Sequence, residues 1–98
     1  MTIKYTKEFI VQLKKQNVRV HKSFKKIIIQ FSKDPNNKEL NSHALTREWQ
    51  GKRSINITAD FRAIYKETQL KNEKIIHFVA LGTHKQLYKQ KKRRDSLN

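Results

Sequence analysis

The sequence has no cysteine, one proline and two glycines among 98 residues. Without cysteine there is no disulfide, no thiolate nucleophile and no Cys-ligated zinc. The scarcity of glycine argues against a Gly-rich phosphate-binding loop, and the single proline argues against a disordered linker. The longest aliphatic run is Ile27–Ile29, which is flanked by lysines and is too short to span a membrane. The N-terminus lacks an apolar core of signal-peptide length, so we expect a cytoplasmic protein.

Acidic residues are also scarce, with 8 Asp and Glu against 23 Lys and Arg, for a net charge of +15. Such a charge opposes compaction unless a polyanion is bound, such as nucleic acid, an anionic membrane surface or an acidic protein. Between residues 9 and 33 there are seven bases and no acid. They form either an ordinary solvated helix face or a surface for RNA or an acidic partner. The length predicts one domain, residues 1–98, with one modest core.

The first third of the chain has the pattern of a strand followed by two helices. Alternation in residues 1–5 predicts a short strand, and Thr6 is placed to cap a first helix. A second helix is the clearest signal, because apolar residues fall at i, i+4, i+7, i+8 and i+11: Val20, Phe24, Ile27, Ile28 and Phe31. Asp34–Pro35 ends it, since the residue before proline avoids the helical conformation.

From residue 53 the apolar period changes to two, which predicts strands near 54–58, 61–66 and 75–81. Residues 83–88 can form one or two helical turns, and residues 89–98 form a basic tail. The order β-α-α-β-β-β predicts an α+β fold, with two helices on one face of a mainly antiparallel four-stranded sheet. The other face would be open, and its bases would offer a seat for a polyanion.

His84 and Tyr88 are spaced i, i+4, so one helical turn would place them on the same face. Imidazole is well suited to proton transfer near neutral pH, although a plain surface histidine is also consistent with this position. Arg62 lies inside a strand, where it either points to solvent or presents its guanidinium group to a phosphate.

Asp60 begins the same strand and is a turn residue, an ion-pair partner of Arg62, or a general base. His43 lies in a polar loop that could approach the same rim. The pattern favours a structural role for His77, a surface position for His21 and a core position for Trp49. A metal site of His43, Asp60 and His84 is conceivable, but no recognised metal spacing supports it, so we expect neither metal nor cofactor.

Three segments together resemble the RelE-type toxins of bacterial toxin–antitoxin modules, and within them the YafQ-like branch. The first is His43–Leu45 followed by Trp49–Arg53, the second is Ile57–Lys66, and the third is Leu81–Tyr88. The Asp-Phe-Arg-x-Ile-Tyr and Gly-Thr-His-x-x-Leu-Tyr motifs carry most of the specificity. About half of the chain takes part in the match.

The resemblance implies the same RelE/ParE-like fold and a metal-independent endoribonuclease that cuts mRNA in the ribosomal A site. It implies a cognate antitoxin as inhibitor, in a hetero-oligomer, with ribosomal RNA and mRNA as further partners and no membrane. By position it assigns as catalytic His43, Asp60, Arg62 and His84. We assign as substrate-binding Asn56, Phe61, Tyr88, Lys85, Lys52 and Arg53. Asn56 stands where the branch usually has another histidine.

The chemistry expected at such a site is attack by the RNA 2′-hydroxyl on its own phosphate. Asp60 or His43 would take the proton, Arg62 would stabilise the phosphorane, and His84 would serve the leaving group. Two rivals remain open at this point. One is a ParE-type toxin of the same fold that poisons DNA gyrase, and the other is an RNA- or ribosome-binding protein without catalytic activity.

Overall fold

The computed structural model describes residues 1–88, and the basic tail predicted for residues 89–98 lies outside this range. Strand β1 (Thr2–Tyr5) leads into helices α1 (Lys7–Lys14) and α2 (Val18–Lys33). Two short 3-10 turns, Lys38–Leu40 and Arg47–Trp49, flank the two-residue strand β2 (His43–Ala44). Strands β3 (Arg53–Asn56), β4 (Phe61–Leu70) and β5 (Glu73–Thr83) follow, and residues 84–88 are helical.

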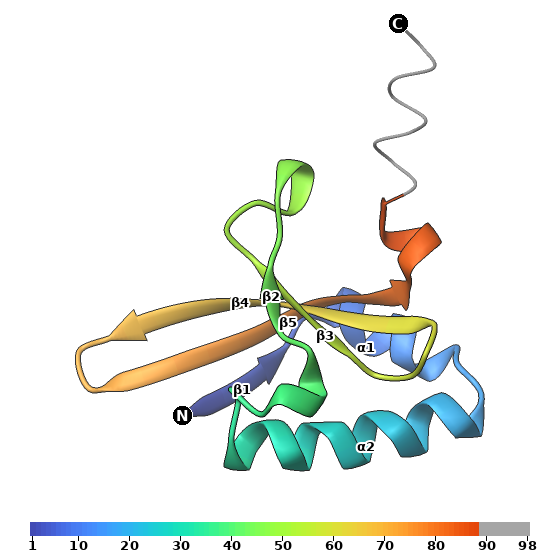
Figure 1. The fold of residues 1–98 in the computed structure, drawn as a ribbon, viewed down its shortest axis with the longest axis horizontal. Coiled ribbons are helices and arrows are strands. Elements are labelled where there is room, and N and C mark those ends of the chain that lie inside the picture. The colour runs from blue at the N-terminus through green and yellow to red at the C-terminus, as the bar shows by residue number, and fades with distance from the viewer. Residues whose placement is uncertain (89–98) are drawn as a thin grey trace, which may run out of the picture.

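The strands form one sheet in the order β1-β5-β4-β3-β2, with both helices on one side of it (Figure 1). Strand β1 runs parallel to β5, and the other neighbours are antiparallel. The predicted α+β layout is therefore confirmed, but the sheet has five strands and not four. The additional strand is β2, whose two residues are too few to show an alternating pattern.

Both helices begin where a side chain satisfies an exposed backbone N–H. Thr6 Oγ1 accepts a hydrogen bond from the Phe9 amide at 3.1 Å, and Asn17 Oδ1 accepts one from Val20 at 3.1 Å. At the other end of α2, Asp34 adopts an extended conformation before Pro35, as predicted.

The main core lies between the helices and the sheet and is rich in aromatic rings. Phe31 and Phe78 are fully buried, with ring centroids 5.6 Å apart, and Phe9 and Phe24 are 5.4 Å apart. Burying one such side chain contributes about 1.5–3 kcal/mol. No helix within residues 1–88 is long and apolar enough to cross a membrane.

The opposite face of the sheet is only partly open, which corrects the expectation of an uncovered face. Leu45, Ile64 and Leu87 form a second, smaller cluster there, and Trp49 packs against it. The indole Nε1 of Trp49 donates to the Leu87 carbonyl at 2.9 Å, which ties the turn at 47–49 to the helical residues 84–88. This cluster supports the helical segment that begins at His84.

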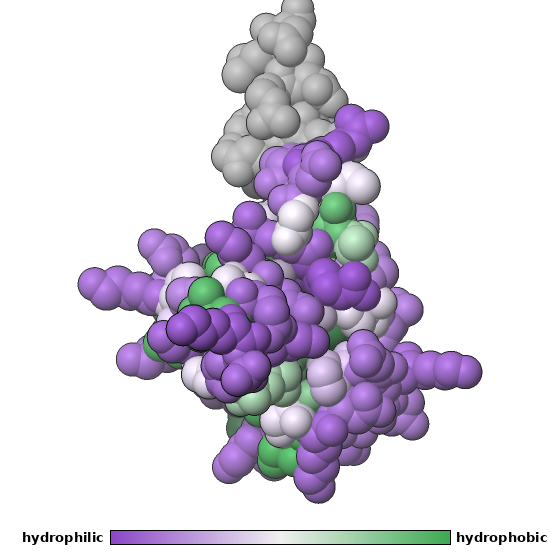
Figure 2. All heavy atoms as spheres, turned by 90° about the vertical axis from the view of Figure 1, so that its left-hand side faces the viewer, coloured by the Kyte–Doolittle hydropathy of each residue, from purple (hydrophilic) through white to green (hydrophobic). Residues whose placement is uncertain are grey.

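Alternation along β4 decides which of its side chains face the helices and which face the second cluster. Ala63 and Tyr65 belong to the main core and Ile64 to the second cluster, as the predicted alternation requires. Arg62 therefore points away from the helices. Seen from the side of the β4–β5 hairpin, the surface is mostly hydrophilic, with small apolar areas between the hydrophilic side chains (Figure 2).

Candidate active site

Sheet register brings Asp60, Arg62 and His84 to one end of the sheet. Arg62 of β4 pairs with Gly82 of β5, so His84 follows the strand only two residues beyond that pair. The His84 amide donates to the Asp60 carbonyl at 3.3 Å, which fixes the start of the helical segment over the β3–β4 turn. Segments far apart in the sequence therefore meet at this turn.

A cleft of about 360 Å³ opens beside this turn and contains two of the predicted histidines. Its lining includes His43, Arg47, Glu48, His84 and Tyr88. The rings of His84 and Tyr88 lie 4.6 Å apart between centroids, so the i, i+4 pair does share one face. Both imidazoles thus reach the same solvent-filled space.

His43 is presented to the cleft by β2, where it pairs with Ser54. Its Nδ1 lies 3.0 Å from the Asn41 carbonyl oxygen. A carbonyl oxygen can only accept, so Nδ1 carries the proton and donates it. In the neutral ring, Nε2 is then the atom with a lone pair, which is the state a general base requires.

Arg62 is half-buried and is held by backbone carbonyls. Its Nη1 donates to the carbonyl oxygens of Thr58, Ala59 and Phe61 at 3.0–3.1 Å. Within residues 1–88 it forms no ion pair with Asp60, whose side chain is exposed. The guanidinium group is therefore fixed to the turn, and its Nη2 forms no hydrogen bond with the residues that the structure describes.

The pKa of Tyr88 is affected by burial and by two charged side chains. Burial raises the pKa of its phenol, the Arg62 cation opposes this rise, and Glu48 adds to it. The hydroxyl therefore stays protonated at neutral pH. Arg62 does not line the cleft itself, but it lies on the same face of β4 as Ile64, whose cluster packs against Tyr88.

Asn56 lies opposite Arg62 on the neighbouring strand. Its Oδ1 is buried and has no hydrogen-bond partner among the described residues. An unpaired buried acceptor costs about 1–3 kcal/mol, and a ligand can relieve this cost only once the side chain turns the oxygen outward. Asparagine can hold a substrate in this way, although it cannot transfer a proton.

Several predicted residues are not brought to the cleft. Phe61 packs against the main core, on the opposite face of β4 from Arg62. Lys52 and Arg53 line a different cavity, and Lys85 is exposed beside His84 without lining the cleft. Within residues 1–88 no three His, Asp or Glu side chains are grouped closely enough to hold a metal ion. His43, Asp60 and His84 therefore form no such group.

The family model for bacterial toxins of type II toxin–antitoxin systems, YafQ, matches residues 1–89. The chain belongs to the YafQ toxin family. It is thus the toxin of a type II toxin–antitoxin system, and the resemblance seen in three motifs is confirmed over most of its length. No curated protein matches this sequence.

Solved structures with this fold include other toxins of such systems. A YoeB/ParE toxin from Agrobacterium tumefaciens has a TM-score of 0.69 at 17% identity, covering 86% of this chain and 99% of its own. YafQ from E. coli strain BL21(DE3) has a TM-score of 0.59 at 23% identity, with coverage of 88% and 96%. The toxin in the E. coli DinJ–YafQ toxin–antitoxin complex has a TM-score of 0.56 at 23% identity, with coverage of 88% and 94%.

Sequence reasoning missed Glu48, the one acid in the cleft of this YafQ-family toxin. It lies in the 3-10 turn Arg47–Trp49, which has no periodic pattern and begins at a residue with φ of 58°. A charged side chain in a polar loop gives no signal of its own. The hydrogen bond from Trp49 to Leu87 and the packing of Leu45 in the second cluster hold this turn beside the cleft.

Proposed function

We propose that this toxin is a ribosome-dependent endoribonuclease that cuts translated mRNA by attack of the RNA 2′-hydroxyl. The observation that carries this proposal is the cleft shared by His43, His84 and Tyr88, with Arg62 on the same face of the sheet. Two imidazoles can carry the two proton transfers of such a reaction, and a guanidinium group can stabilise its phosphorane. The reaction would take place in the cytoplasm, where ribosomes translate.

RNA supplies its own nucleophile, so the protein must move two protons and stabilise one phosphorane. His43 Nε2 takes the 2′ proton, because its Nδ1 is committed to the Asn41 carbonyl. The exposed Asp60 carboxylate is the second candidate for this role. His84 protonates the departing 5′-oxygen, and Arg62 stabilises the phosphorane. The products are a 2′,3′-cyclic phosphate and a 5′-hydroxyl.

Substrate binding adds a stacking surface and an unpaired acceptor. Tyr88 is half-buried, and the remaining part of its ring can stack on a base, a contact worth about 1–3 kcal/mol. Asn56 Oδ1, which is buried without a partner, would accept from a sugar hydroxyl or a base amino group after its side chain turns outward. Lys85, exposed beside His84, is placed to contact the RNA backbone.

The partners follow from charge and from the family. A relative of this fold is seen in a toxin–antitoxin complex, so we expect an antitoxin that silences this chain. The whole chain has a net charge of +15. The basic side chains of the helices would contact phosphates of ribosomal RNA. The ribosome would then position mRNA in the cleft.

The test is to map mRNA 5′ ends after brief induction of the wild type and of two variants, His84→Ala and Arg62→Ala. We expect codon-phased breaks with the wild type and a loss of cleavage of about 100-fold or more with each variant. His21→Ala is the control, because it removes an exposed imidazole from α2 and should leave the breaks unchanged.

Either rival would give a different pattern. A gyrase poison would leave mRNA intact and cause DNA damage signals that survive both substitutions. A binding protein without catalytic activity would produce neither breaks nor damage. Wild-type cleavage by both variants would show that His84 and Arg62 are not the catalytic groups.

A further inference from the structure

A second cavity, of about 490 Å³, lies on the other side of β2 from the His84 cleft. Its lining includes Arg53, Tyr65 and Ile76. Ala44 lines both cavities, so β2 separates them. Arg53 pairs with Tyr65, whose ring belongs to the main core, so this cavity opens toward the helix side of the sheet.

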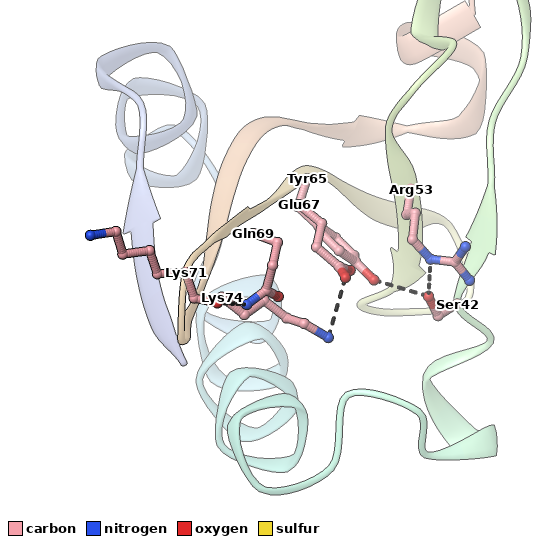
Figure 3. A network of polar contacts seen from close by, with 7 residues as sticks. All are labelled: Ser42, Arg53, Tyr65, Glu67, Gln69, Lys71 and Lys74. Atoms are coloured by element: carbon pink, nitrogen blue, oxygen red, sulfur yellow. Dashed lines mark hydrogen bonds and ion pairs between the residues drawn. The ribbon is translucent and has the colours of Figure 1, made fainter.

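Arg53 is held in place through one of its three nitrogens. Its Nε donates to Ser42 Oγ at 3.1 Å, and Ser42 Oγ lies 3.1 Å from the hydroxyl of Tyr65 (Figure 3). Tyr65 is only 2% exposed, so this chain of contacts is anchored in the core. Within residues 1–88 the two Nη atoms form no hydrogen bond or ion pair. The guanidinium group is therefore oriented in advance and keeps two donors for a ligand.

The charge at this cavity is positive and largely uncompensated. The Glu67 carboxylate lies 3.2 Å from Lys74 Nζ, so these two charges neutralise each other (Figure 3). Lys52 and Arg53 are both half-buried and add two cations. An adjoining cavity of about 390 Å³, also lined by Arg53, adds Lys38. The expected ligand is therefore an anion with the planar shape of a carboxylate or the oxygens of a phosphate.

Two features favour a peptide carboxylate over a nucleic-acid phosphate. Part of the wall is apolar, formed by Pro35, Ala44 and Ile76. In addition, β4 continues to Leu70, whereas its pairing with β3 stops at Tyr65. The edge of residues 66–70 away from β5 thus offers alternating backbone donors and acceptors, a pattern that an extended peptide matches and an RNA backbone does not.

We infer that this cavity binds a carboxylate side chain of an extended, acidic segment of a partner protein, which lies along the 66–70 edge of β4. The partner is the antitoxin, and this identification rests on the proposed function. The guanidinium group of Arg53 holds the carboxylate in a two-pronged hydrogen bond. Lys52 adds a second positive charge.

The test measures binding of a short synthetic peptide in which Glu alternates with Val. Its Gln–Val counterpart and a short oligouridylate are the comparison ligands. Arg53→Gln should weaken binding of the acidic peptide about tenfold, because a hydrogen bond between charged groups is lost. Arg53→Lys should have an affinity between those of the wild type and Arg53→Gln, since it keeps the positive charge and loses the two-pronged hydrogen bond. Arg19→Gln is the matched control, because it removes the same charge from the exposed face of α2.

Equal losses in Arg53→Gln and Arg19→Gln would overturn the proposal, because binding would then follow net charge alone. Tighter binding of oligouridylate than of the acidic peptide, with the same dependence on Arg53, would assign the cavity to RNA and also overturn it.

Chemical-shift mapping of the wild type keeps the test independent of how the variants fold. The acidic peptide should shift the Arg53 Nε–H signal and the amides of residues 66–70. Shifts confined to His84 and Tyr88 would contradict the proposal. The assay needs neither ribosomes nor mRNA, so its failure would remove this site and leave the ribonuclease proposal standing.

Discussion

Three side chains, at the cleft, at the β3–β4 turn and at the second cavity, share one arrangement. One polar atom of the side chain is hydrogen-bonded to the protein, and another remains available to bind a ligand. His43 gives Nδ1 to the Asn41 carbonyl and keeps Nε2. Arg62 gives Nη1 to the carbonyls of the β3–β4 turn and keeps Nη2. Arg53 gives Nε to Ser42 and keeps both Nη atoms. Such anchoring lowers the entropy that a side chain loses when it binds a ligand or transition state.

Tyr88 gives a prediction at the same scale. Burial raises its pKa above the ordinary 10.0, so the folded state holds this proton more tightly than the unfolded state. The free energy of unfolding should therefore fall as pH rises past 10.0 toward the folded pKa. In a phenolate absorbance titration, Tyr88→Phe should remove a step that lies above 10.0. Removal of a step below that value would contradict the assignment.

The positions of some elements depend on single hydrogen bonds between them, and the bond from Trp49 to Leu87 is the clearest case. Trp49→Phe removes the Nε1 donor and leaves the Leu87 carbonyl without it. We expect the free energy of unfolding to fall by about 1 kcal/mol in urea titrations. Amide exchange of residues 84–88 should rise, and mRNA cleavage should fall because His84 loses its support. Unchanged exchange in that segment would show that the bond does not position it.

The cap of α2 provides a second prediction for an element. Asn17→Ala removes the acceptor for the Val20 amide and should lower the free energy of unfolding by about 1 kcal/mol. Asn17→Ser keeps an acceptor at the same place and should restore most of that loss. Equal destabilisation by both substitutions would mean that the side-chain oxygen does not act as the cap.

The sequence predicts elements well where burial imposes a period. The stripe from Val20 to Phe31 and the alternation around Ala63 and Tyr65 both follow from contact with one core. Strand β2 and the turn at 47–49 have no such period, because they are held by single contacts. For the same reason the sequence indicates Arg62 from strand alternation and His84 from its helical i, i+4 spacing with Tyr88. It cannot place Glu48 in the cleft or Arg53 in the second cavity.

At the scale of the whole molecule, the excess of bases predicts how binding depends on salt. For Z phosphate contacts with single-stranded RNA, log affinity falls against log salt with a slope of about −0.7Z. Lys22→Gln with Lys26→Gln removes two exposed cations from α2 and should flatten the slope for ribosome binding by about 1.4. A wild-type slope near zero would contradict the electrostatic account of ribosome binding.

The two cavities lie on opposite faces of one sheet. Strand β2 separates them, with His43 facing the cleft and Ala44 lining both. A partner bound at the Arg53 cavity would therefore approach from the helix side, and RNA bound at the cleft would approach from the other side.

The most direct measurement concerns the 2′-hydroxyl, on which the whole chemical account depends. Ribosomes would be programmed with an mRNA that carries one 2′-deoxynucleotide at a mapped cleavage site, and the cut fraction compared with the all-ribose message. We predict no cleavage at the substituted position, with a 2′,3′-cyclic phosphate and a 5′-hydroxyl at the unmodified sites. Cleavage of the deoxy linkage at the rate of the ribose linkage would contradict the account.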